Sequence, residues 1–146
     1  MPKWLKVVLL VFGVLVLLCG LGVGGVTWWF NQNKDRLVEE GKRVTAEGTA
    51  FGGTSTSEGC ITEGLRRLDS ASGFMGEVEA GLFLEACLTA APRDTLCTGV
   101  PKKTDFLKAA LWASEQCASR KHERDQACGR LMQRVADFCA KPAVAK

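Results

Sequence analysis

The stretch Cys128–Cys139, CGRLMQRVADFC, predicts an amphipathic α-helix with a cysteine at each end. Its apolar residues recur at intervals of three and four, which is the period of an amphipathic α-helix. These residues are Leu131, Met132, Val135 and Phe138. Because a cysteine stands at each end, both ends can be joined covalently to neighbouring segments. We therefore expect a helical domain whose helix ends are tied by disulfides.

Three earlier segments show the same helical period. The first follows Ser55-x-x-Glu58, the spacing of a capping box at a helix start, and ends at the break 70–73. The second ends at Pro92, and Thr104 is placed to cap the third. The third segment carries Leu107, Ala110, Leu111, Ser114 and Cys117 on one face. No segment alternates as a strand, so the expected fold class is all-α, with about four helices in the domain. No Gly or Pro separates the last two helices within residues 118–124, and one long bent helix is the alternative there.

Six cysteines follow the first thirty residues, and all lie near predicted helix ends. They are Cys60, Cys87, Cys97, Cys117, Cys128 and Cys139. In an up-down bundle the start of one helix lies beside the end of its antiparallel neighbour. This geometry favours the pairs 60–87, 97–139 and 117–128, although six cysteines allow fifteen connectivities. An even cysteine count in a domain this small indicates disulfides and an oxidising compartment.

The run Val7–Phe30 holds 24 residues without a charge. A helix of that length reaches roughly 36 Å at about 1.5 Å per residue, enough to cross a ~30 Å hydrocarbon core. Lys3 and Lys6 precede the run, which favours a cytoplasmic N-terminus with the cysteine domain on the outer side. Trp4 at one end, with Trp28 and Trp29 at the other, suits two membrane interfaces. We predict a single-pass signal-anchor that contacts the bilayer through residues 7–30.

A cleaved signal peptide is the competing interpretation of this run. Small residues at Gly20–Gly22 resemble a cleavage site, but the apolar stretch is longer than the 7–15 residues of a typical signal peptide. Both interpretations deliver the domain to the periplasmic or extracellular side. Cys19 is left over inside the run. Gly13, Gly20 and Gly24 share roughly one helical face, where glycines allow close helix packing in a membrane and self-association.

The predicted organisation has four parts. Residues 1–30 are the membrane anchor, and 31–56 form a juxtamembrane stalk followed by a Gly/Ser/Thr linker. Residues 57–141 form the cysteine-rich helical domain, and 142–146 a disordered tail. The flexible linker is expected from residue 49 onward, where the sequence reads TAFGGTSTSEG.

Charge divides the domain into two halves. Residues 57–100 hold seven acids and three bases, a net charge of −4, whereas 101–146 hold ten bases and five acids, a net charge of +5. The halves can complement each other inside one fold. The alternative is a basic face for anionic lipid headgroups or an acidic partner, made by Arg120, Lys121, Arg124, Arg130 and Arg134. Nucleic acid is not an expected partner on the exported side.

No residue pattern predicts catalysis, a cofactor or a metal. The cysteines lack the closely spaced pairs of structural zinc sites and of thiol redox centres. His122 is the single histidine and lies among charged residues, as in a solvated turn. We therefore expect no enzyme.

The leading functional hypothesis is a non-catalytic, membrane-tethered interaction or structural module of a cell envelope, with an envelope protein or a second copy as partner. The alternative is a carrier or sensor of lipids or small apolar ligands, because a disulfide-braced bundle can enclose a cavity. The aromatic residues available to line such a cavity are Phe74, Phe83, Phe106, Trp112 and Phe138.

Overall fold

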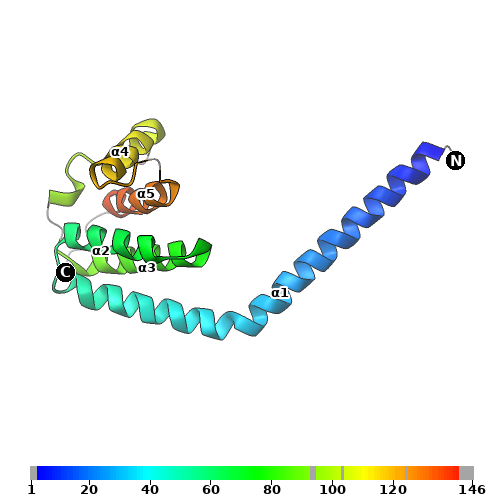
Figure 1. Ribbon diagram of the computed structural model, residues 1–146, viewed down its shortest axis with the longest axis horizontal. Coiled ribbons are helices and arrows are strands. Elements are labelled where there is room, and N and C mark those ends of the chain that lie inside the picture. The colour runs from blue at the N-terminus through cyan, green and yellow to red at the C-terminus, as the bar shows by residue number, and fades with distance from the viewer. Residues whose placement is uncertain (1–2, 93–94, 103, 124, 142–146) are drawn as a thin grey trace. The chain divides into compact units, whose positions relative to one another are not determined.

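The computed structural model describes residues 3–92, 95–102, 104–123 and 125–141 of the 146 residues, without the side chains of residues 3, 5–10, 13–19 and 21. Its elements within these ranges are all helical (Figure 1). They are α1 (Lys3–Gly52), α2 (Ser57–Ser70), α3 (Gly73–Ala90), the 3₁₀-helix η1 (Thr95–Cys97), α4 (Phe106–Ser119) and α5 (Gln126–Ala140). The expected all-α class is therefore confirmed. The predicted tail, 142–146, lies outside the described residues.

The chain divides into two compact units, Met1–Glu40 and Gly41–Lys146. The first unit consists of the N-terminal part of α1, and among its described side chains Trp4, Trp28 and Trp29 are exposed. Within the described residues, no helix combines the length and the apolar character needed to cross a membrane. Half of the predicted span, 12 of its 24 residues, has side chains outside the description, and the span stays a prediction.

The C-terminal part of α1 packs on α3 inside the second unit. Val44 is 2% exposed, and Gly48 and Gly52 follow it at intervals of four residues on the buried face of the helix. A Cβ atom on Gly48 would lie 2.5 Å from the carbonyl oxygen of Phe83, and one on Gly52 would overlap the carbonyl group of Cys87. The two helices therefore approach backbone to backbone, which only glycine permits here.

This packing corrects the predicted boundary of the folded domain. The prediction of a flexible linker from residue 49 is wrong for 49–52, because α1 continues to Gly52, and the folded unit begins at Gly41 instead of residue 57. The glycines of this segment indicate close helix packing and not flexibility. A short turn at 53–56 then leads into α2, whose N-cap is Thr56 and not Ser55, with the Thr56 hydroxyl accepting from the Gly59 N–H at 3.1 Å.

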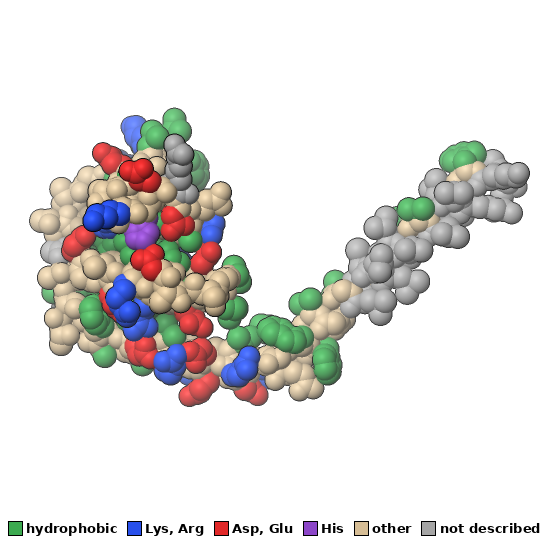
Figure 2. Space-filling view, viewed as in Figure 1, with side chains coloured by type: hydrophobic (Ala, Val, Ile, Leu, Met, Phe, Trp, Pro, Cys, Tyr) green, Lys and Arg blue, Asp and Glu red, His purple; other side chains and the backbone are tan. Residues whose placement is uncertain are grey.

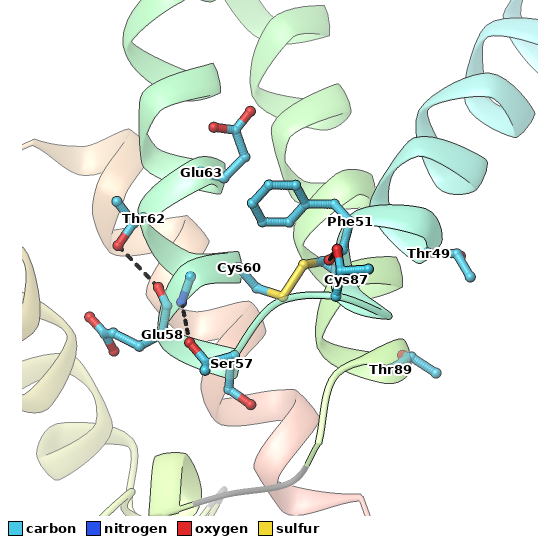
Figure 3. Close-up of a disulfide and its surroundings, with 12 residues drawn as sticks. Thr49, Phe51, Ser57, Glu58, Cys60, Thr62, Glu63, Cys87 and Thr89 are labelled. Atoms are coloured by element: carbon cyan, nitrogen blue, oxygen red, sulfur yellow. Dashed lines mark hydrogen bonds between the residues drawn. A yellow bond between two sulfur atoms is a disulfide. The ribbon is translucent and has the colours of Figure 1, made fainter.

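Helices α2 and α3 form a pair joined by the Cys60–Cys87 disulfide, whose Cα atoms are 5.7 Å apart. Figure 3 shows this bridge between the two helices with Phe51 of α1 beside it. The buried Ser57 hydroxyl donates to the carbonyl of Pro92 at 2.9 Å, which ties the start of α2 to the segment that leaves α3.

A turn separates α4 from α5 and excludes the alternative of one long bent helix. Helix α4 ends at Ser119, and Lys121 adopts the left-handed backbone conformation with φ of 66°. Asp125 then caps α5 by accepting from the Ala127 N–H at 2.9 Å. Because Lys121 adopts this conformation, the chain turns without a Gly or a Pro. The sequence therefore contains no helix-breaking residue at this turn.

Helix α5 lies between α4 and the α2–α3 pair in Figure 1 and supplies the centre of the core. Its apolar stripe is buried as predicted, with Met132 and Val135 fully inaccessible. These side chains join Phe83 and Leu84 of α3 in one apolar cluster. The remaining disulfides are Cys97–Cys139 and Cys117–Cys128, with Cα separations of 5.3 and 6.1 Å. All three bridges are the pairs that helix order predicts.

Adding one methyl group at the contact of α1 with α3 tests this packing. We expect Gly52→Ala to lower the free energy of unfolding by about 1–3 kcal/mol, because the new Cβ overlaps the α3 backbone. Gly41→Ala is the matched control in the same helix, since nothing lies within 4 Å of its Cβ position. We expect that control to stabilise the protein by about 0.5–1 kcal/mol. Urea unfolding with intact disulfides measures both, and equal effects would contradict the packing.

Candidate interaction surface

The aromatic residues proposed to line a cavity do not converge. Phe83 and Phe138 are buried in the core, at 0% and 6% exposure. Phe74 and Phe106 lie at 75% and 80% exposure on the surface, and Trp112 packs partly buried against the core. The prediction that a shared cavity is built from these five side chains is therefore wrong.

The inward face of α4 differs from the predicted one. Ala113 and Cys117 are buried, whereas Leu107 and Leu111 are 75% and 62% exposed. Cys117 must face α5 because it is bonded to Cys128. Leu111 precedes Cys117 by six residues, which at 3.6 residues per turn places it about 120° away around the helix. Ala113 precedes Cys117 by four residues and shares its face, so alanine and not leucine packs inward.

The outward face of α4 consequently carries an apolar patch. We define the α4 patch as Phe106, Leu107, Ala110 and Leu111, all of which are exposed. Figure 2 shows hydrophobic side chains at the surface of the unit where Figure 1 places α4. Contiguous exposed apolar side chains on a small domain are typical of an interaction surface. Of the predicted stripe, Cys117 is buried, whereas Leu107, Ala110, Leu111 and Ser114 face solvent, so the predicted inward face is wrong for those four residues.

A cleft and charged side chains border the α4 patch. A cleft of about 220 Å³ lies between the start of α4 and α5, lined by Pro101, Phe106, Ala110 and Ala136 among others. Lys108 and Glu115 lie on the exposed surface of α4. The Lys108 ammonium is 3.7 Å from an oxygen of Asp105, a long contact between two well-exposed side chains.

The predicted basic residues mostly contact the acidic half of the domain. Arg120 donates to Glu58 at 2.6 Å, and Arg130 donates to Glu77 at 2.7 Å. Arg134 packs over Gly81, where a Cβ atom would lie 2.6 Å from its Nε. Lys121 is exposed in the turn, and Arg124 lies outside the described residues. These contacts match the interpretation in which the two halves complement each other.

A groove of about 660 Å³ runs between α1 and α3. It is lined by Thr45, Thr49, Gly53, Leu82, Glu85, Ala86, Thr89 and Ala90. Small side chains leave this groove open, and most of the surface they present there is apolar.

An ionic cluster fastens α1 and α2 beside Phe83. Arg67 donates to Glu63 at 3.1 Å and to Glu47 of α1 at 3.0 Å, and its guanidinium lies 3.8 Å from the centre of the Phe83 ring. Hydrogen bonds from Arg66 hold the pKa of the Glu63 carboxyl below its ordinary value of 4.5. Partial burial opposes this shift, and the hydrogen bond from Arg67 adds to it.

His122 lies at the turn between α4 and α5 and is mostly buried, not solvated as predicted. Its Nδ1 is 3.6 Å from Asp69 and 3.7 Å from Asp125. In Figure 2 this histidine, drawn in purple, is seen among acidic side chains. The described residues contain no group of three or more His, Cys, Asp or Glu side chains placed to hold a metal ion.

The predicted membrane-packing glycines are placed only in part. Gly20 and Gly24 have no heavy atom within 4 Å of their Cβ positions, so their face of α1 is open. The side-chain position of Gly13, like that of Cys19, lies outside the described residues.

Comparison with known proteins gives no further assignment. No protein-family model matches the sequence, and no curated protein or solved structure is significantly similar to the chain.

Sequence reasoning missed the outward orientation of α4. The signal that could have shown it is the spacing of Ala109, Ala113 and Cys117, three small residues at intervals of four. Such a stripe packs closely on a neighbouring helix, and its cysteine needs a partner. The leucine stripe is more apolar, and hydrophobicity alone therefore favours it as the inward face.

The Glu63 contacts predict a pH-dependent contribution to stability. Because the folded pKa of Glu63 is lowered, its ionised form stabilises the fold fully above about pH 4.5, and this contribution is lost as the pH falls toward the folded pKa. We expect Glu63→Gln to cost about 1 kcal/mol at pH 7, with a smaller difference from the wild-type protein at pH 3. Urea unfolding at both pH values measures the difference. The exposed Glu123→Gln is the control, and a Glu63→Gln effect that grows on acidification would contradict the prediction.

Proposed function

We propose that this chain is a non-catalytic, membrane-tethered interaction module of a cell envelope. The observation that carries the proposal is the α4 patch, where Phe106, Leu107 and Leu111 are between 62% and 80% exposed. Exposing large apolar side chains together costs solubility, and a surface that must bind a protein partner accounts for it. The patch lies on a helix that the Cys117–Cys128 disulfide joins to α5, which restricts the orientation in which it is presented.

The tether in this proposal rests on the sequence. The uncharged run Val7–Phe30 is long enough for a bilayer, and Lys3 and Lys6 favour a cytoplasmic start. The three disulfides support an oxidising compartment for the domain. Together these features favour a domain displayed on the outer side of a membrane.

The proposal assigns no catalytic role. The side chain of the single histidine contacts two aspartates at the turn between α4 and α5, and its described side-chain contacts include no serine or cysteine. The six outer cysteines are all consumed in bridges. Binding through a surface is therefore the function that these residues support best.

Site-specific photo-crosslinking in the native envelope tests the proposal. A photoreactive benzoylphenylalanine at position 111 of the full-length chain should give defined protein adducts after illumination, seen by immunoblot and identified by mass spectrometry. The matched control places the same residue at position 74 on α3, where Phe74 is 75% exposed against 62% for Leu111. We expect Leu107→Asp to reduce the adducts at position 111 by about tenfold, as for loss of a central contact. Absence of adducts at 111, or equal adducts at both positions, would contradict the proposal.

A second candidate, carriage of an apolar ligand, rests on the groove between α1 and α3. Its volume of about 660 Å³ falls within the range of small-molecule sites. Native mass spectrometry of the full-length chain purified from its envelope distinguishes the two functions. For an interaction module we expect no retained ligand that depends on the groove. A ligand mass that Ala86→Trp removes and the exposed control Thr62→Trp keeps would favour the carrier instead.

A further inference from the structure

We propose that the exposed face of α4, which carries the α4 patch at its N-terminal half, binds the same face on a second copy of this chain, with the two α4 helices antiparallel about a two-fold axis. This inference rests on the proposed function and names its partner.

Side-chain size changes along the exposed face of α4. Its N-terminal half presents Phe106, Leu107 and Leu111, whereas its C-terminal half presents Ser114 and Ala118, which are also exposed. When two copies lie antiparallel, the bulky half of each covers the small half of the other. The face is therefore complementary in shape to itself, as a two-fold interface requires.

The spacing of these residues fits the seam of a two-helix contact. Leu107, Leu111, Ser114 and Ala118 follow one another at intervals of four, three and four. This is the alternation that keeps one narrow stripe of a helix facing a partner helix. Within the second unit the stripe has no such partner helix among the described residues, since all four residues are exposed.

Charge fixes the direction of the pairing. Lys108 borders the bulky half of the stripe, and Glu115 follows seven residues later on the same side. In an antiparallel pair, Lys108 of each copy lies beside Glu115 of the other, which makes two opposite-charge contacts. A parallel pair would set leucine against leucine and would not bring Lys108 of one copy beside Glu115 of the other. The long, exposed contact of Lys108 with Asp105 is weak and leaves the ammonium free to turn to a second copy.

One helix pair makes a smaller contact than the ~800 Å² per partner of a standard interface. We therefore expect weak association in dilute solution and stronger association at a membrane, where confinement raises the effective concentration. The test must keep the full chain in a bilayer.

Charge reversal in liposomes provides the test. Full-length chains carrying donor or acceptor dyes on a C-terminal tag report association by resonance energy transfer. We expect Lys108→Glu alone, or Glu115→Lys alone, to weaken association by about tenfold, because two attractive contacts become repulsive. Donor-labelled Lys108→Glu mixed with acceptor-labelled Glu115→Lys should restore energy transfer to the wild-type level, since both contacts again join opposite charges. This rescue also shows that both variants are folded.

Glu123→Lys, a charge reversal on an exposed residue of the α4–α5 turn, is the control and should leave energy transfer unchanged. Absence of energy transfer in the wild-type chain would overturn the inference, and so would single reversals without rescue on mixing. Loss of transfer on Gly20→Ile but not on the charge reversals would assign association to α1 and also overturn it. If photo-adducts at position 111 join only a different protein, the inference fails while the proposed function stands. If no adduct forms there, the proposed function itself fails.

Discussion

Three sulfur–sulfur bonds between helix ends are the constraint on which the folded unit depends. The unit is small, and a core of that size supplies little net stability by itself. Each bridge joins segments that are 11 to 42 residues apart in the chain, and in the chain-entropy model each removes freedom from the unfolded state. The bonds also set orientation. Cys117–Cys128 decides which face of α4 packs inward, and the exposed patch is the direct result.

The helical segments and the disulfide pairs could be predicted from the sequence because both depend on the spacing of residues along the chain. Leu131, Met132, Val135 and Phe138 form the buried stripe of α5, and the three disulfides join the helix ends that an up-down bundle brings together. Each of these inferences needs only the spacing of residues and the short connections between helices.

Contacts between elements were not readable in the same way. Gly48 and Gly52 lie where the composition of the sequence is typical of a linker, yet they let α1 lie directly on the backbone of α3. Leu107 and Leu111 are of a residue type that usually lies in a protein core, yet they face solvent. In both cases a neighbouring helix decides the outcome, and one sequence gives no measure of how closely a neighbour approaches. The charges of the two halves were interpreted more successfully, since Arg120–Glu58 and Arg130–Glu77 join them as complementarity predicts.

The disulfide between Cys117 and Cys128 also affects when α4 reaches its final orientation during folding. While the nascent chain is still reduced, nothing covalent fixes the rotation of α4, and its leucines can bury themselves against any apolar surface nearby. Oxidation then selects the rotation that turns Ala113 inward and the leucines outward. The α4 patch would form only after this cysteine pair is oxidised, so its exposure depends on the redox state of the chain.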